Sequence, residues 1–175
     1  MIQDINLNLQ LRIDDPDWQA RWTPALARLT VQAVETTLLA QKKVTLKYPA
    51  YDVSILLAGN TAAARLNTDH RGKDYVPNVL SFPMDREPAG PNEPVMLGDL
   101  VLTHNIIAAE AKTQGKTFRR HYAHLLVHGT LHICGYDHGT PGQARSMERL
   151  EKEVLASLNI PDPYHTSPRP KISRR

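Results

Sequence analysis

Apolar and polar residues alternate strictly in INLNLQLRI (residues 5–13), a pattern that predicts a half-buried β-strand. The compact apolar run DVSILLAG (52–59) predicts a second, more deeply buried strand, and NVLSF (78–82) and MLGDLVLTH (96–104) predict two more. Between the last two, DREPAGPNEP (85–94) holds three prolines, which is typical of an exposed connection. The pattern therefore predicts a sheet of four strands.

A spacing of three and four residues between apolar side chains predicts the first helix, from about residue 17 to residue 40. Its apolar positions are Trp18, Trp22, Leu26, Leu29 and Ala33. A short helix is expected over 60–67, after the second strand. RGKDYVP (71–77) is then expected to be a loop because of its glycine, proline and charges.

The second half of the chain reads as helical. A helix over 104–114 can end at Gly115, which adopts the left-handed conformation without steric cost. Thr117 is a suitable N-cap for the next helix, which should run through His132, and TPGQ (140–143) supplies the cap, proline and glutamine that start the last one. The expected fold is a single α+β domain in which a small mixed four-stranded sheet packs with about five helices.

Length, charge and composition set the expected domain limits and location. The 175 residues suit one domain, which we place at residues 1–162, followed by a basic and disordered tail over 163–175. The first residues lack the pattern of a signal peptide, and no apolar run is long enough to span a membrane. With a single cysteine, Cys134, the chain is expected in the reducing cytoplasm.

Three of the eight histidines lie within HGTLHICGYDH (128–138). His128 and His132 are four residues apart, so on a helix both side chains project from one face. Gly135 can end that helix at positive φ, and His138 could then complete a metal site at the end of this core helix. His124 lies one turn earlier on the same stripe, where a packing histidine is more typical than a hydrogen-bond donor to a ligand.

Three imidazoles leave one open position on a tetrahedral zinc ion, which is typical of a catalytic site. The sequence therefore predicts one zinc ion per chain. Metzincin proteases share this histidine spacing but carry a glutamate directly after the first histidine as general base. Gly129 occupies that position here, so a metzincin-like protease is only a minor alternative.

HGTLHICGYDH closely resembles the signature H-G-x-L-H-x-x-G-Y-D-H of the YbeY family of bacterial endoribonucleases. The segment LNTDHRGKDYVPNVLSFP (66–83) resembles a second hallmark of that family, and LGDLVLT (97–103) a third. The resemblance implies metal-dependent cleavage of single-stranded RNA, above all maturation of the 3′ end of 16S ribosomal RNA, and a part in ribosome quality control. It also implies the small ribosomal subunit and its proteins as partners, with the GTPase Era as a plausible neighbour.

The same resemblance implies roles for individual residues. The family's zinc ligands correspond to the three histidines above, and its functional arginine corresponds to Arg71. Arg71 is expected to clamp the scissile phosphate, with Lys73 and Asn78 also contacting the RNA. In this loop Val76-Pro77 replaces the family's Pro-Thr, which shifts the proline and removes a hydroxyl.

A rival interpretation is a non-catalytic RNA-binding factor for ribosome assembly, whose zinc is structural. The absence of a base beside the first histidine and the basic residues of the tail favour it. The three-ligand set argues against it, because structural zinc sites take four protein ligands.

Overall fold

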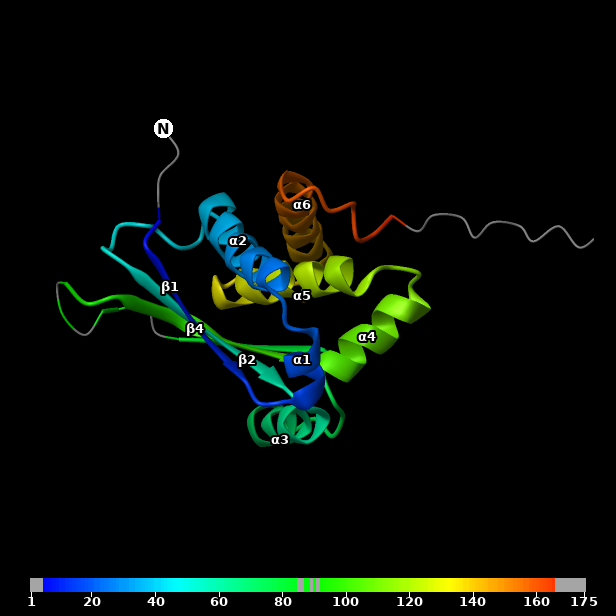
Figure 1. Cartoon of the computed structure of the whole chain (residues 1–175). Helices are drawn as coiled ribbons and strands as arrows, with labels where there is room; N and C mark the ends of the chain where they lie inside the picture. The colour runs from blue at the N-terminus through cyan, green and yellow to red at the C-terminus, as the bar shows by residue number, and fades with distance from the viewer. Residues whose placement is uncertain (1–4, 85–86, 89, 91, 166–175) are drawn as a thin grey trace, which may run out of the picture.

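A four-stranded mixed sheet forms the centre of the molecule, as the sequence predicted (Figure 1). The computed structural model describes residues 5–84, 87–88, 90 and 92–165. The strands are β1 (Leu7–Ile13), β2 (Tyr51–Ala58), β3 (Val79–Pro83) and β4 (Val95–Thr103). They lie in the order β1-β2-β4-β3; β1, β2 and β4 are parallel, and β3 runs antiparallel at the edge beside β4.

Six helices surround this sheet. They are α1 (Pro16–Arg21), α2 (Pro24–Ala40), α3 (Asn60–Arg71), α4 (His104–Thr113), α5 (Phe118–Ile133) and α6 (Pro141–Ser157). Helices α2 and α5 cover one face of the sheet, α6 packs outside them, and α3 lies on the opposite face (Figure 1). None of the helices in the described ranges is both long and apolar enough to cross a membrane.

The prediction of a single helix over residues 17–40 was wrong, because the chain forms α1 and α2 there. Pro24 lacks a backbone N–H and disfavours the helical conformation for the residue before it. Thr23 is therefore extended, and its side chain accepts a hydrogen bond from the Leu26 N–H as the N-cap of α2. The apolar spacing continues through this break, so periodicity alone did not reveal it.

The helix expected over residues 60–67 is longer than predicted. Helix α3 runs to Arg71 and ends at Gly72, whose φ of 63° lies in the left-handed region. The sequence suggested a loop at Arg71, but this residue lies in the last turn of a helix. Of the charged residues in the predicted loop, only Arg71 lies in α3, where it is exposed; Lys73 and Asp74 follow Gly72 in the connection to β3.

Other local signals worked as predicted. Gly115 has a φ of 65° after α4, and the Thr117 side chain caps α5. Thr140 and Gln143 form the reciprocal hydrogen bonds of a capping box at the start of α6. These caps fix where α5 and α6 begin, and both helices carry residues of the site described below.

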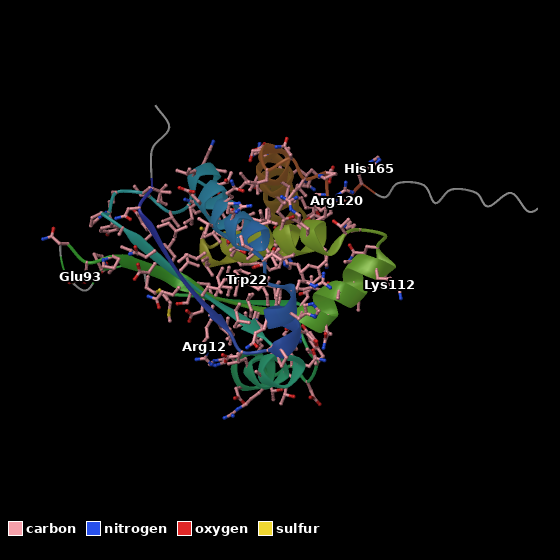
Figure 2. The ribbon with its side chains drawn as sticks, viewed as in Figure 1. Arg12, Trp22, Glu93, Lys112, Arg120 and His165 are labelled. Atoms are coloured by element: carbon pink, nitrogen blue, oxygen red, sulfur yellow. The ribbon has the colours of Figure 1, made fainter. Side chains whose placement is uncertain are left out.

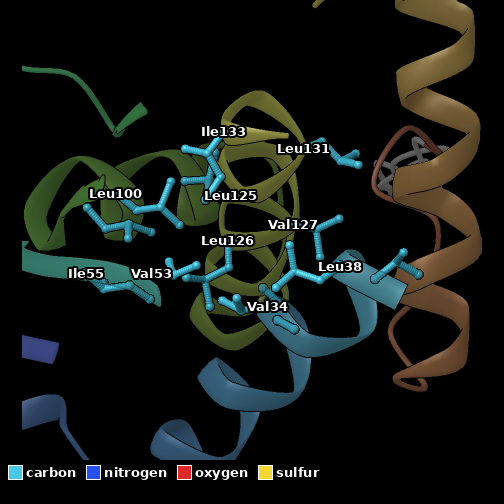
Figure 3. Packing of buried hydrophobic residues seen from close by; sticks show 14 of the residues in the cluster. Val34, Leu38, Val53, Ile55, Leu100, Leu125, Leu126, Val127, Leu131 and Ile133 are labelled. Atoms are coloured by element: carbon cyan, nitrogen blue, oxygen red, sulfur yellow. The ribbon is translucent and has the colours of Figure 1, made fainter. Parts of the chain in front are cut away.

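Helix α5 is the core helix of the domain. Its apolar side chains point both toward the sheet, near Val53 and Leu100, and toward Val34 and Leu38 of α2 (Figure 3). Cys134, directly after this helix, is buried in the same cluster, as expected of a small apolar side chain. The histidines His124, His128 and His132 of α5 are half-buried, and the first two contact Glu151 of α6.

The end of α5 approaches the sheet closely at Gly98. A register shift in the β2–β4 pairing interrupts the ladder just before this residue, whose φ is 153°. A Cβ atom at Gly98 would lie 2.4 Å from the Phe82 carbonyl oxygen and 2.9 Å from Ile133 Cγ2. Gly98 thus allows the last residue of α5 to rest on the sheet.

We expect Gly98→Ala to lower the free energy of unfolding by about 2–3 kcal/mol, because backbone and a buried side chain must both move. Denaturant unfolding followed by circular dichroism measures this change. Gly142→Ala is the matched control, since a Cβ there has no neighbour within 4 Å in the described structure. Equal destabilisation by the two substitutions would contradict the assigned contact.

Candidate metal centre

Helix α5 presents two of the three predicted ligands, His128 and His132, one turn apart and both half-buried. The chain then reverses at Gly135, whose φ is 89°, as the sequence predicted. The Gly135 N–H donates to the His132 carbonyl oxygen at 2.9 Å, and the Tyr136 N–H donates to the Leu131 carbonyl oxygen at 3.0 Å. This turn carries the chain back along the helix end.

The turn brings His138 next to the two helical histidines. One ring nitrogen of each of the three lies within 4.8 Å of the others, and the Nε2 atoms of His128 and His132 are 3.1 Å apart. The His138 ring lies 5.0 Å from the His132 ring and 5.5 Å from the His128 ring, between centroids. The three residues predicted as ligands therefore come together in space.

A buried carboxylate supports this group from behind. Glu151 of α6 is fully buried, and its Oε1 accepts a hydrogen bond from His128 Nδ1 at 2.7 Å. Its Oε2 lies 3.3 Å from His124 Nε2 and also accepts a hydrogen bond from the Tyr164 hydroxyl. Burial raises the pKa of Glu151, but these hydrogen bonds outweigh it and lower that pKa to about 2.

The ionised carboxylate determines which His128 nitrogen is available to a metal. Ionised Glu151 can only accept, so Nδ1 of a neutral His128 must carry the proton, and its Nε2 keeps a lone pair directed toward His132. A carboxylate on the far nitrogen of a ligand histidine is the usual arrangement around zinc. Burial, followed by the neighbouring charges of His128 and His138, lowers the pKa of His132 to about 4, so this imidazole is neutral at neutral pH. The donor set therefore fits a zinc ion.

His124 has a different role from the one favoured by the sequence. It is a hydrogen-bonding neighbour of Glu151 and not simply a packing histidine. Together His124, His128 and Glu151 form a second group with metal-ligand spacing. Here, however, the Nδ1 of His128 is already engaged with the Glu151 carboxylate, so we interpret this group as support for the three-histidine site.

Gly129 marks the place where α5 packs on the sheet. A Cβ atom there would lie 3.0 Å from Leu100 Cδ2 and 3.2 Å from both Ser81 Oγ and Val79 Cγ2. A glutamate at this position would meet the sheet. Gly129 stands where metzincin proteases have their glutamate. The same glycine lets α5 approach β3 and β4 closely.

Arg71 lies beside the same edge strand. Its Nη2 atom donates to the Ser81 carbonyl oxygen at 3.3 Å, while the Ser81 hydroxyl lies on the side of the strand that faces Gly129. The remaining guanidinium donors of Arg71 are available because the residue is exposed. Ser81 of β3 thus lies between Arg71 and Gly129, the residue that follows His128.

The other two predicted contact residues differ in their surroundings. Lys73 is exposed just beyond the glycine that ends α3. The Asn78 amide donates to both carboxylate oxygens of Glu110, at 3.2 and 3.0 Å, and its Oδ1 accepts from the Val79 N–H at 2.6 Å. The Asn78 side chain therefore joins β3 to α4 and has little capacity left for a ligand.

A hollow of about 820 Å³ lies on the opposite face of the sheet, beside α3. Arg12, Ser54, His70 and Phe82 are among the residues that line it, and none of the three candidate ligands does. The metal-ligand group is thus at the open end of α5, separate from this hollow.

Comparison with known proteins identifies the family. The sequence model of the family described as Endoribonuclease YbeY matches residues 13–159. The chain belongs to the YbeY family. A relative named Endoribonuclease YbeY from Paramagnetospirillum magneticum is 40% identical over 163 residues, which cover 91% of this chain and 98% of the relative. One of the same name from Bartonella bacilliformis is 37% identical over 158 residues, which cover 90% of this chain and 97% of the relative.

A third YbeY relative, from Xanthomonas oryzae, is 48% identical over 116 residues, 65% of this chain and 71% of the relative. Among solved structures, a solution structure of a Thermotoga maritima protein matches with a TM-score of 0.52 and 19% identity, covering 96% of this chain and all of the other. At that identity the match supports the fold alone. The family resemblance drawn from the sequence motifs is confirmed.

Sequence reasoning missed Glu151, although the chain contains a signal for it. Helix α6 buries an apolar stripe that includes Met147, Leu150 and Val154. Glu151 lies on that stripe, four residues after Met147 and three before Val154. A lone acid inside an apolar stripe needs a buried partner, and a histidine helix was the available candidate.

We expect Glu151→Gln to weaken zinc affinity by about 10- to 100-fold, because His128 loses the charged acceptor that orients it. Competition with a chromogenic chelator gives the affinity. Glu153→Gln is the matched control, since Glu153 lies on the same helix but is exposed and contacts Arg149. Unchanged affinity for Glu151→Gln would show that this carboxylate does not support the site.

Proposed function

We propose that this YbeY-family chain is a zinc-dependent endoribonuclease that cuts single-stranded RNA. The observation that carries the proposal is the group of three histidine donors, with a buried carboxylate on the rear nitrogen of His128. The names of the relatives supply the reaction class. One zinc ion per chain, held by His128, His132 and His138, is the proposed cofactor.

The proposed division of labour follows from the chemistry of these residues. Bound zinc supplies Lewis acidity for a phosphodiester oxygen or for the attacking group. The exposed guanidinium of Arg71 holds the scissile phosphate and offsets the negative charge that develops in the transition state. Lys73 adds a positive charge along the RNA backbone. We assign Asn78 a supporting role, in which it fixes the start of β3 through Glu110.

The proposed substrate and setting come from the family resemblance. They are single-stranded regions of ribosomal RNA, with maturation of the 16S 3′ end and ribosome quality control as the processes, in the cytoplasm. The small ribosomal subunit, its proteins and the GTPase Era are the proposed partners. Basic side chains around α4 and the start of α5, including Lys112 and Arg120, project from one end of the molecule and suit a polyanionic partner (Figure 2).

We expect Arg71→Glu to reduce cleavage of a single-stranded RNA by about 100- to 1,000-fold, as for loss of one transition-state donor, while zinc content stays at one per chain. Cleavage assays and elemental analysis on the same preparation measure both quantities. Arg65→Glu is the matched control, because it makes the same charge change on the same helix, where Arg65 pairs only with Asp69 among the described ion pairs. Equal loss in both variants would refute a specific clamp, and loss of zinc would make Arg71 a folding residue.

Zinc removal distinguishes this proposal from a structural metal in an assembly factor. The apolar side chains of α5 pack in the core, whereas His128 and His132 are only half-buried and His138 is exposed. We therefore expect the metal-free protein to keep cooperative thermal unfolding but to lose cleavage, with recovery after one equivalent of zinc. His128→Ala with excess zinc gives the background rate. Collapse of the folded state on chelation would favour a structural metal.

A further inference from the structure

The segment after α6 turns back onto the body of the domain. Asn159 has a φ of 57°, and the Ile160 N–H donates to the Leu155 carbonyl oxygen at 2.8 Å, which ends the helix. The side chain of Ile160 and residue Pro163 are both buried. The described chain then passes the start of α5, where Figure 2 labels its last residue, His165. The chain therefore remains attached beyond residue 162, where the sequence placed the start of a tail.

Two basic side chains hold this segment in place. Lys116, in the α4–α5 connection, donates from Nζ to the Pro163 carbonyl oxygen at 2.6 Å. Lys152 of α6 lies 3.5 Å from the Asp162 carboxylate, and its Nζ lies 5.4 Å from the centre of the Tyr164 ring. The Asp162 Oδ1 atom accepts from the Tyr164 N–H at 2.8 Å. Tyr164 is thus fixed by its main chain as well as by its ring.

The Tyr164 side chain reaches the support of the metal-ligand group. Its hydroxyl donates to Glu151 Oε2, and its ring packs edge-on against His124 with centroids 5.5 Å apart. His124 Nε2 lies 3.3 Å from the same oxygen, so Oε2 has two partners, the His124 ring and the Tyr164 hydroxyl. Because a carboxylate is planar, holding Oε2 also fixes the direction in which Oε1 meets His128.

We propose that Tyr164 is a positioning residue of the metal centre, which acts through Glu151 on the orientation of His128. Neither Tyr164 nor its segment belongs to the histidine motif, and the family model ends at residue 159. The proposal makes the C-terminal segment part of the functional site. Residues 166–175, with the remaining basic side chains of the predicted tail, lie outside the described residues.

The proposal rests on the proposed zinc site, so its test reads metal affinity directly. In the full chain, Tyr164→Phe removes only the hydroxyl and keeps the ring beside His124. We expect zinc affinity to fall about tenfold, the lower end of the range for residues that support ligands. The Co(II)-substituted protein should show an altered visible absorption spectrum, which a merely structural role would not change. Tyr48→Phe is the matched control, because its ring packs against Tyr51 and not against α5.

A double-mutant cycle tests whether Tyr164 acts on zinc affinity through Glu151. In the Glu151→Gln background, Tyr164→Phe should change zinc affinity by less than about twofold, since the residue through which it acts is already altered. A full tenfold loss in that background would overturn the route through Glu151. Wild-type affinity and spectrum for Tyr164→Phe alone would overturn the positioning role while leaving the zinc site intact. Failure of the unsubstituted chain to bind zinc would instead overturn the proposed function.

Discussion

The hydrogen bond between the Glu151 carboxylate and His128 Nδ1 is the interaction on which the site depends. It joins α6 to α5, places a negative charge inside the domain, and leaves Nε2 of His128 facing His132. A buried carboxylate without donors would be strongly destabilising. Here the donors are His124, His128 and Tyr164. The hydrogen bond that orients His128, the first candidate ligand, is therefore also one of those that lower the pKa of Glu151.

The scaffold holds this arrangement through close backbone approaches. Gly129 lets α5 pack against β3 and β4, and Gly98 lets the last residue of α5 rest on the sheet. The two histidines of α5 therefore lie on a helix whose opposite side is fixed by apolar packing. The third candidate ligand is less constrained, because His138 lies on an exposed turn after Gly135. A rigid pair with one ligand on a turn is compatible with metal entry from solvent.

Much of this was predictable from local patterns. Strands with clear alternation, caps such as Thr117 and Thr140, and the three histidines were all read from residues close together in the chain. The division between α1 and α2 was missed because apolar spacing continues across Pro24. The last turn of α3 was missed because Arg71 directly precedes Gly72 and the charged connection that follows it.

The supporting residues could not be found by such patterns. Glu151 lies 23 residues from His128, and Tyr164 lies 13 residues from Glu151, so only the packing of α5, α6 and the final segment brings them together. The motif also misled at Asn78, because its partner is distant in the sequence. A motif position expected to contact RNA has its amide bonded to Glu110, 32 residues away.

X-ray absorption spectroscopy of the zinc-loaded protein, with metal content measured on the same sample, identifies the ligands of the metal. We expect one zinc per chain with imidazole nitrogens from three histidines at about 2.0–2.1 Å and no sulfur ligand. A sulfur scatterer at about 2.3 Å, or the lack of a stoichiometric metal, would contradict it.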